Sequence, residues 1–158
     1  MKKNIFSPSK AGRAFLSKKV LPIFLAVGLL ATSAFASDEN KSHAATSLKK
    51  NFSTAENIKW KVTDNYTKAS FSWNGQQMEV FYNEKGETIA ISRIIGKETL
   101  PIKAQQTIQK KYAEYTIAEA IEYNSEENGV TYYVTVTKDN KKEVLNISFD
   151  GDVSVYRP

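Results

Sequence analysis

Side chains able to transfer protons or attack a substrate are sparse in this chain of 158 residues. It contains one histidine, His43, and no cysteine, so a catalytic triad would depend on a single imidazole and a cysteine nucleophile is excluded. A zinc site built from cysteines or from several histidines is excluded by the same counts. We therefore predict no catalytic residue, no metal site and no cofactor.

Carboxylates in two segments are the remaining candidates for chemistry. Glu126 and Glu127 precede Asn128-Gly129, and Asp150-Gly151-Asp152 could offer two oxygens to calcium. Both segments are also typical of tight turns, because Asn, Asp and Gly tolerate the backbone conformations that turns require. We interpret them as turns and keep a carboxylate-dependent hydrolase, acting at Glu126 or Asp150, as an alternative.

Residues 1–36 are typical of a secretory signal peptide. Six basic side chains and no acidic one occur there, an apolar run follows over Val20–Ala31, and Ala34-Phe35-Ala36 supplies small residues for cleavage. The alternative is a permanent membrane anchor, but a spanning helix needs roughly 20 apolar residues and this run is shorter. We predict cleavage after Ala36 and a periplasmic or secreted protein.

Removal of the leader changes the charge. The whole chain has 22 basic and 17 acidic side chains, and all 17 acidic ones lie beyond residue 36, so the expected mature chain carries 16 against 17, a net charge of −1. A nucleic-acid partner and an anionic membrane surface are therefore not indicated. Without its leader the chain has 122 residues, enough for one domain to fold without disulfides.

Apolar spacing predicts two helices after a flexible lead-in at 37–42. In the segment 43–55, Ala45, Leu48 and Phe52 recur at intervals of three and four residues, which places them on one helix face. Thr99 before Leu100-Pro101 is a typical helix start, and the following apolar residues recur every fourth position as far as Tyr112.

Alternating apolar and polar residues predict four strands after each helix. Asn74-Gly75 separates two alternating runs and is a strong hairpin signal, because a type I′ turn needs positive φ at both central positions. The expected strands span 58–62, 67–73, 76–83, 87–95, 115–123, 130–137, 143–149 and 153–156. The predicted fold class is α+β: two tandem repeats, 43–96 and 97–158, each a helix followed by a four-stranded antiparallel sheet.

Several short segments, in order, carry a resemblance to a known family. They are Phe52 with Ala55, Ile58 and Trp60; the turn Tyr82–Glu87; Leu100-Pro101; Tyr112; Tyr132-Tyr133-Val134; and Phe149-Asp150-Gly151. Together they resemble the beta-lactamase-inhibitor-like, PepSY-like family of exported bacterial proteins. The resemblance implies one PepSY-like domain over 43–158, a fold like that of a beta-lactamase inhibitor protein and a binding role; inhibition of any enzyme would need a matching interface.

Aromatic residues out of phase with the core should lie on the sheet face opposite the helices. The candidate partner-binding residues on this face are Tyr66, Lys68, Glu79, Phe81, Tyr133 and Thr135. A solvent-exposed sheet face that carries aromatic side chains can anchor a partner protein. The alternative is that the cross-strand aromatic pairs serve only to stabilise the sheet.

We therefore hypothesise an exported, non-enzymatic module that holds a protein or peptide on this face. Inhibition of a secreted hydrolase is a narrower form of this hypothesis, and a purely structural envelope protein is an alternative. We expect no nucleic-acid partner and no membrane contact after cleavage. The identity of the partner and the oligomeric state are open at this point.

Overall fold

The structure of the protein, a computed structural model, describes residues 37–157. The predicted signal peptide at 1–36 lies outside the described residues. Within the described range, no helix is long and apolar enough to cross a membrane.

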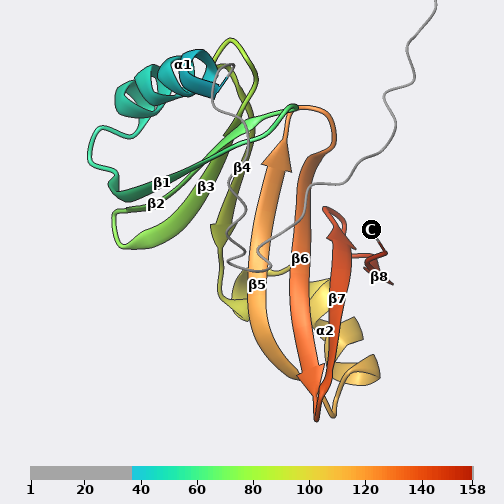
Figure 1. Ribbon diagram of the computed structural model, residues 1–158. Helices are drawn as coiled ribbons and strands as arrows, with labels where there is room; N and C mark the ends of the chain where they lie inside the picture. Colours follow the sequence, from blue (N-terminus) through green and yellow to red (C-terminus); the bar gives the residue numbers. More distant parts are fainter. Residues whose placement is uncertain (1–36, 158) are drawn as a thin grey trace, which may run out of the picture. The chain divides into compact units, whose positions relative to one another are not determined.

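Eight strands form one antiparallel sheet in which each strand pairs with its neighbours in the chain (Figure 1). The strands are β1 (Glu56–Val62), β2 (Thr67–Trp73), β3 (Gln76–Tyr82), β4 (Thr88–Ile94), β5 (Thr116–Ser125), β6 (Gly129–Lys138), β7 (Lys141–Ser148) and β8 (Val153–Val155). The helices are α1 (Ser37–Asn51), α2 (Ile102–Lys111) and the short 3-10 helix η1 (Lys97–Thr99). The α+β class and the positions of the eight strands agree with the sequence prediction.

The prediction of two separate four-stranded sheets is corrected by the pairing of β4 with β5. This pairing runs from Ala90 opposite Ser125 to Ile94 opposite Ile121, so the two expected sheets are halves of one. A hydrogen-bonded ladder between the halves removes two exposed edges, which explains why one sheet is preferred. The order of one helix and four strands occurs twice, and internal duplication of the sequence stays a prediction.

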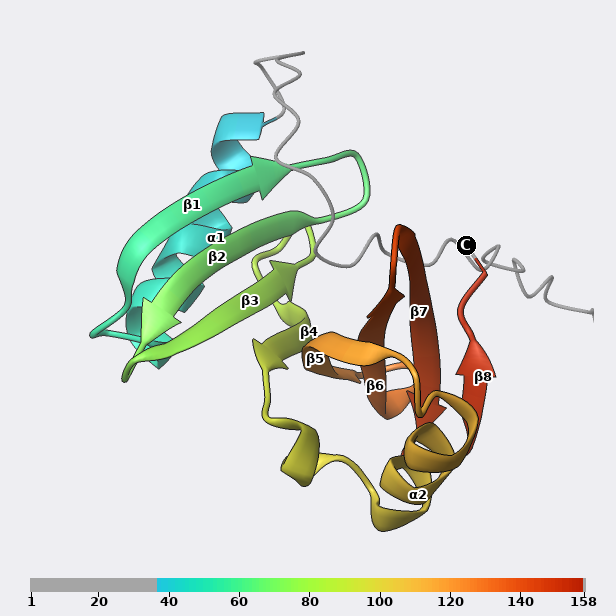
Figure 2. The same ribbon diagram turned by 90° about the horizontal axis from the view of Figure 1, so that it is seen from below.

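Both helices cover the same face of the sheet. Ala44 and Leu48 of α1 are buried against β2 and β3, and Ala104 and Ile108 of α2 are buried in a second core with β5, β6 and β7. Figures 1 and 2 show α1 beside β1–β3 and α2 beside β5–β7. We call the opposite side of the sheet the helix-free face.

The register shows that the helix-covered face is continuous across the two halves, and the helix-free face is therefore continuous as well. Val80 on β3 lies opposite Ile91 on β4, and Arg93, two residues further along β4, lies opposite Glu122 on β5. Residues directly opposite each other in an antiparallel pair point to the same side of the sheet. The ladder continues to Tyr132, which lies opposite Glu122 and belongs to the core under α2.

The helix starts differ from the predicted ones. α1 begins at Ser37, so the segment 37–42, expected to be a flexible lead-in, is helical; its flexibility stays a prediction. α2 begins at Ile102, and its N-cap is Pro101, without a side-chain hydrogen bond. Thr99, predicted to cap this helix, instead ends η1. Short 3-10 turns are frequent next to the first turn of an α-helix.

Two glycine turns bring the strands against the helices. Gly86, between β3 and β4, has φ +76°, and a Cβ placed there would lie 2.7 Å from the backbone of His43 on α1. The Ser47 hydroxyl of the same helix donates a hydrogen bond to the Gly86 carbonyl oxygen at 2.6 Å. Gly151, between β7 and β8, has φ +88°, and a Cβ placed there would lie 3.0 Å from the Cβ of Lys103 on α2 and 3.1 Å from that of Pro101.

We expect Gly86→Ala to destabilise the fold more than Gly75→Ala. Both positions have positive φ, which costs a non-glycine residue about 1–2 kcal/mol. Nothing lies within 4 Å of a Cβ at Gly75, whereas the backbone of α1 obstructs one at Gly86, and overpacking adds about 1–3 kcal/mol. Urea unfolding measures both variants, and equal losses would contradict this account of the turn.

Candidate functional site

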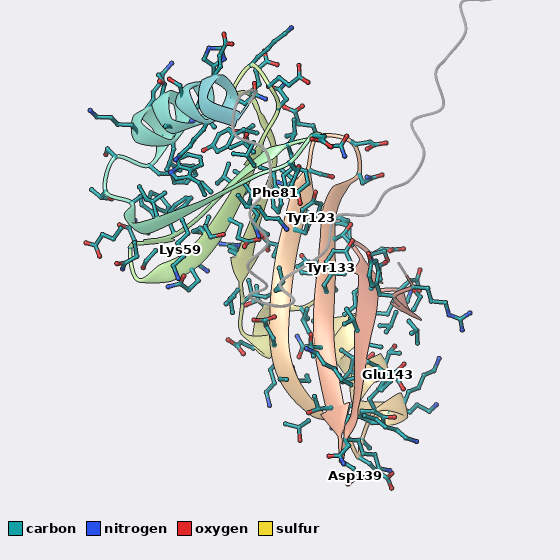
Figure 3. The ribbon with its side chains drawn as sticks, in the orientation of Figure 1. Lys59, Phe81, Tyr123, Tyr133, Asp139 and Glu143 are labelled. Carbon is teal, nitrogen blue, oxygen red and sulfur yellow. The ribbon has the colours of Figure 1, made fainter. Side chains whose placement is uncertain are left out.

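Five aromatic side chains form a connected row on the helix-free face. Ring centroids are 5.5 Å apart for Tyr66–Phe81, 6.0 Å for Phe81–Tyr123, 6.2 Å for Tyr123–Tyr133 and 5.5 Å for Tyr133–Tyr156. All four contacts are edge-on, the geometry that aromatic quadrupoles favour. Figure 3 labels the three central rings, which follow one another across β3, β5 and β6. We call these five residues the aromatic row.

Two rings of the row are buried, and the two end rings and the middle ring are more accessible. Phe81 is 4% exposed and Tyr133 is 9% exposed, whereas Tyr66, Tyr123 and Tyr156 are half-buried. Burial raises the pKa of all four tyrosines in the row. Their phenols are therefore neutral near pH 7 and can donate as well as accept hydrogen bonds.

A buried ion pair lies beside the row. The Lys68 ammonium is 2.6 Å from Oε1 of Glu79, and the Glu79 side chain is only 5% exposed. The Ser70 hydroxyl donates to the same oxygen at 2.9 Å, and the Lys68 nitrogen lies 5.8 Å from the centre of the Phe81 ring. A buried pair of this kind is tolerated because several polar contacts compensate for lost hydration.

Two further polar groups extend this charged region toward β5. The Ser92 hydroxyl is buried, between Glu79 and Tyr123 in the register, and has no hydrogen-bond partner within the part of the chain that the structure describes. Burial raises the pKa of the Glu119 carboxyl, and the negative charge of Glu79 adds to this effect while Lys142 opposes it. The helix-free face therefore combines aromatic rings with carboxylates held in low-dielectric surroundings.

The structure places all six predicted site residues on the helix-free face. Lys68, Glu79, Phe81 and Tyr66 contact one another directly. Tyr133 lies on β6 and reaches this group only through Tyr123. The sixth residue, Thr135, is also on β6, opposite Glu119 and 9% exposed. The placement agrees with the prediction, and the partner-binding role of these residues stays a proposal.

Sequence analysis missed Tyr123 and Tyr156. A bulge between Ile117 and Glu119 shifts the phase of β5, so Tyr123 lies on the helix-free face although Ile117, six residues earlier, packs in the core. Simple alternation cannot detect such a shift. Tyr156 follows Val153 by three residues, and because Val153 also packs against the core, alternation alone could have placed Tyr156 on the opposite face.

The predicted end of the seventh strand is wrong by one residue. We expected this strand to span 143–149 and so to include Phe149, whose side chain is 73% exposed. β7 ends at Ser148, and Phe149 lies in the turn before Gly151. Because the strand has ended, the alternation that buries Leu145 and Ile147 no longer applies.

The carboxylate segments considered for catalysis lie in separate turns. Glu126 is exposed in the turn between β5 and β6, and Asp150 is exposed between β7 and β8. A hydrogen bond from Ser148 lowers the pKa of Asp150, which is opposite to the raised pKa of a general acid. Among residues 37–157, no cluster of three or more His, Cys, Asp or Glu is arranged to hold a metal ion.

Known proteins match this chain in structure. No family model and no curated protein sequence matches it. A DUF2874 family protein from Bacteroides uniformis has a TM-score of 0.64 at 16% identity, covering 71% of this chain and 84% of its own. A BLIP-like protein from Bacteroides fragilis has a TM-score of 0.59 at 21% identity, covering 80% and 86%. A protein from Bacteroides eggerthii, named as a predicted periplasmic protein, has a TM-score of 0.65 at 19% identity, covering 76% and 86%.

These similarities define the class of the fold. The chain has the α+β fold of BLIP-like proteins, that is, of proteins similar to beta-lactamase inhibitor protein, as the family resemblance predicted. The three solved structures span most of the described residues, and their own names indicate no enzyme family. At these identities the likeness concerns the fold alone.

The ionisation of Tyr123 tests the packing of the row. Burial, with smaller effects of Tyr133, Tyr66 and Glu127, raises the pKa of Tyr123 to about 12, against roughly 10 in an unfolded chain. The folded state therefore binds the phenol proton of Tyr123 more strongly than the unfolded state does. The protonated ring contributes to stability below about pH 10, and this contribution is lost as the pH rises through about 12.

We expect Tyr123→Phe to reduce the fall in unfolding free energy between about pH 10 and 12, measured by urea unfolding. Burial also raises the pKa of Tyr82, in the core under α1, to about 12. Tyr82→Phe is therefore the matched control and should produce a similar reduction. A pH dependence unchanged in Tyr123→Phe would contradict the burial of this ring.

Proposed function

We propose that the protein is an exported, non-enzymatic binding module that holds a protein or peptide on its helix-free face. The observation that carries this proposal is the aromatic row, which crosses β3, β5 and β6 beside the Lys68–Glu79 pair. Large aromatic rings surrounded by polar groups are the residues that contribute most binding energy in protein interfaces.

The packing of the row favours binding by a preformed surface. Phe81 and Tyr133 are held in place by neighbours on both sides, so little side-chain entropy would be lost when a partner covers them. The half-buried rings of Tyr66, Tyr123 and Tyr156 are the parts that a partner could contact directly. Each also carries a neutral phenol that can form a hydrogen bond at the rim.

The proposed location outside the cytoplasm rests on two observations. Residues 1–36 have the order of features of a cleaved leader, and a structural neighbour from Bacteroides eggerthii is named as a predicted periplasmic protein. The absence of cysteine from the chain is compatible with export, because its core is large enough to fold without disulfides.

Site-specific photocrosslinking tests the binding face. Ser154 is exposed beside the row, opposite Asn146 on the helix-free face, and Lys110 is exposed on α2. We expect a benzoylphenylalanine at position 154, but not at 110, to give a discrete adduct in cells that produce the protein. Tyr156→Ala should remove this adduct while circular dichroism shows a folded chain.

The opposite pattern would overturn the proposed face. Adducts formed only from position 110 would place the partner on the helix side, and adducts unaffected by Tyr156→Ala would mean that the row does not contribute. Phe81→Ala is unsuitable for this test, because removing a buried Phe side chain costs about 3–5 kcal/mol of stability and Phe81 is 4% exposed.

Inhibition of a secreted hydrolase is the second candidate function. It is favoured by one observation, the structural likeness to a protein named as BLIP-like. An inhibitor must present a surface complementary to the active-site region of its target, and the aromatic row would be that surface in this proposal.

Enzyme assays test this second candidate separately. We expect residues 37–158, purified and added at micromolar concentration, to slow at least one enzyme in a panel of beta-lactamases and envelope peptidases. Tyr66→Ala should weaken this inhibition, because it removes the terminal ring of the row. If the protein changes the rate of no enzyme in the panel, the inhibition proposal is overturned. The binding proposal is then decided by the crosslinking experiment alone.

A further inference from the structure

The first part of β5 has a free edge. Pairing with β4 ends where Ile94 lies opposite Ile121, and the last hydrogen bond from this side runs from the Ile95 N–H to the Ala120 carbonyl oxygen at 2.9 Å. β5 itself begins at Thr116 and is paired there with β6 alone. Residues 116–119 therefore present one side of a strand without a neighbouring strand in the described structure.

A groove runs along this free edge on the side of the sheet that α2 covers. After Ile95 the chain turns away from β5 through η1 before it enters α2 (Figure 2). The resulting cavity has a volume of about 1,020 Å³ and lies between η1, α2 and the start of β5. Its lining includes Leu100, Ile108, Tyr112, Ala113, Ile117 and Ala118. We call this cavity the β5 groove.

The walls of the β5 groove combine apolar and aromatic side chains with polar ones, which include Lys97, Glu98 and Glu119. Leu100 and Ile108 form its floor and belong to the core under α2. The rings of Tyr112 and Tyr115 meet edge-on at 5.4 Å and line it as well. Gln105 is already engaged, since its amide donates to the carbonyl oxygen of Leu100 at 2.7 Å. The groove is thus a pocket for an apolar side chain beside unpaired backbone.

We propose that the β5 groove binds an extended peptide segment of a partner protein, which adds to β5 as a strand and places an apolar side chain in the cavity. This interaction surface is separate from the helix-free face and goes beyond the proposed function. Backbone N–H and C=O groups on a strand edge are matched by the backbone of another strand. Alternate side chains of an added strand point to opposite sides, so every second residue would face α2.

The contrast with the outer edges of the sheet favours β5 as the edge that accepts a partner. β1 carries the charged residues Lys59 and Lys61, and β8 has only three residues. Charged residues and short length are features that prevent pairing at outer edges. The β5 edge presents Thr116 and the small, exposed Ala118, and its one charged residue, Glu119, is half-buried.

The length of the free edge favours a single extended segment over the sheet of a second folded molecule. Residues 116–119 span about 13 Å at the usual rise of a strand, and the edge is bounded by η1 and α2. The bulge between Ile117, which pairs with Val136, and Glu119 changes the direction of the backbone there, and bulges recur beside binding sites. A second copy of this chain would have to insert a strand edge between these two elements.

Peptide selection tests the proposal. A phage-displayed library of random linear heptapeptides is selected on immobilised residues 37–158, and enriched peptides are synthesised and titrated by calorimetry. We expect enriched sequences with apolar residues at alternate positions. Ala118→Trp, which fills the groove from its exposed side, should weaken their binding about tenfold or more, whereas Thr46→Trp, on the exposed surface of α1, should not.

N-methylation of the peptide backbone gives a readout independent of the protein variants. Methylation at alternate residues should abolish binding, and methylation at the intervening residues should be tolerated, because only every second N–H faces β5. The proposal is overturned if no peptide is enriched, if Ala118→Trp and Thr46→Trp bind equally, or if N-methylation has no effect. Loss of binding in Tyr156→Ala alone would assign the peptides to the helix-free face instead.

Discussion

The antiparallel pairing of β4 with β5 is the constraint on which the rest of the structure depends. It joins two units of one helix and four strands into a single sheet, and Arg93 reinforces the junction with two hydrogen bonds to the Glu122 carboxylate at 2.9 and 3.0 Å. It also brings Tyr123 beside Phe81, which connects the aromatic rings of the two halves. Because the same pairing stops at Ile94, it leaves one side of the start of β5 without a neighbouring strand among the described residues.

The helix-free face carries aromatic and charged side chains that pack against one another like a second core. Phe81 and Glu79 are each 4% exposed although no helix covers them in the described structure, so their neighbours on the sheet supply the burial. Such packing stabilises the sheet, and it also holds the outer rings in fixed positions. A face of this kind can bind without ordering first, which lowers the entropic cost of association.

The local elements were predictable because each depends on residues close in sequence. Asn74-Gly75 closes the hairpin between β2 and β3, with φ of 51° and 78°, and alternation located all eight strands. The joining of these strands into one sheet was not predictable, since the choice of partner for β4 depends on a strand more than 20 residues away. The apolar pattern of each half is equally compatible with two small sheets, and loop-closure entropy and edge pairing decide between them.

For the candidate site, the sequence by itself determined which residues leave the core on strands of regular phase, and Tyr66, Lys68, Glu79, Phe81, Tyr133 and Thr135 all lie on the helix-free face. A two-residue side-chain period is a property of the backbone, so it can be read without tertiary structure. Only the tertiary structure decided that these residues belong to one row, because Tyr123 enters it through a bulge that reverses the phase of β5. Bulges and strand partners arise from contacts between distant segments, and no local pattern records them.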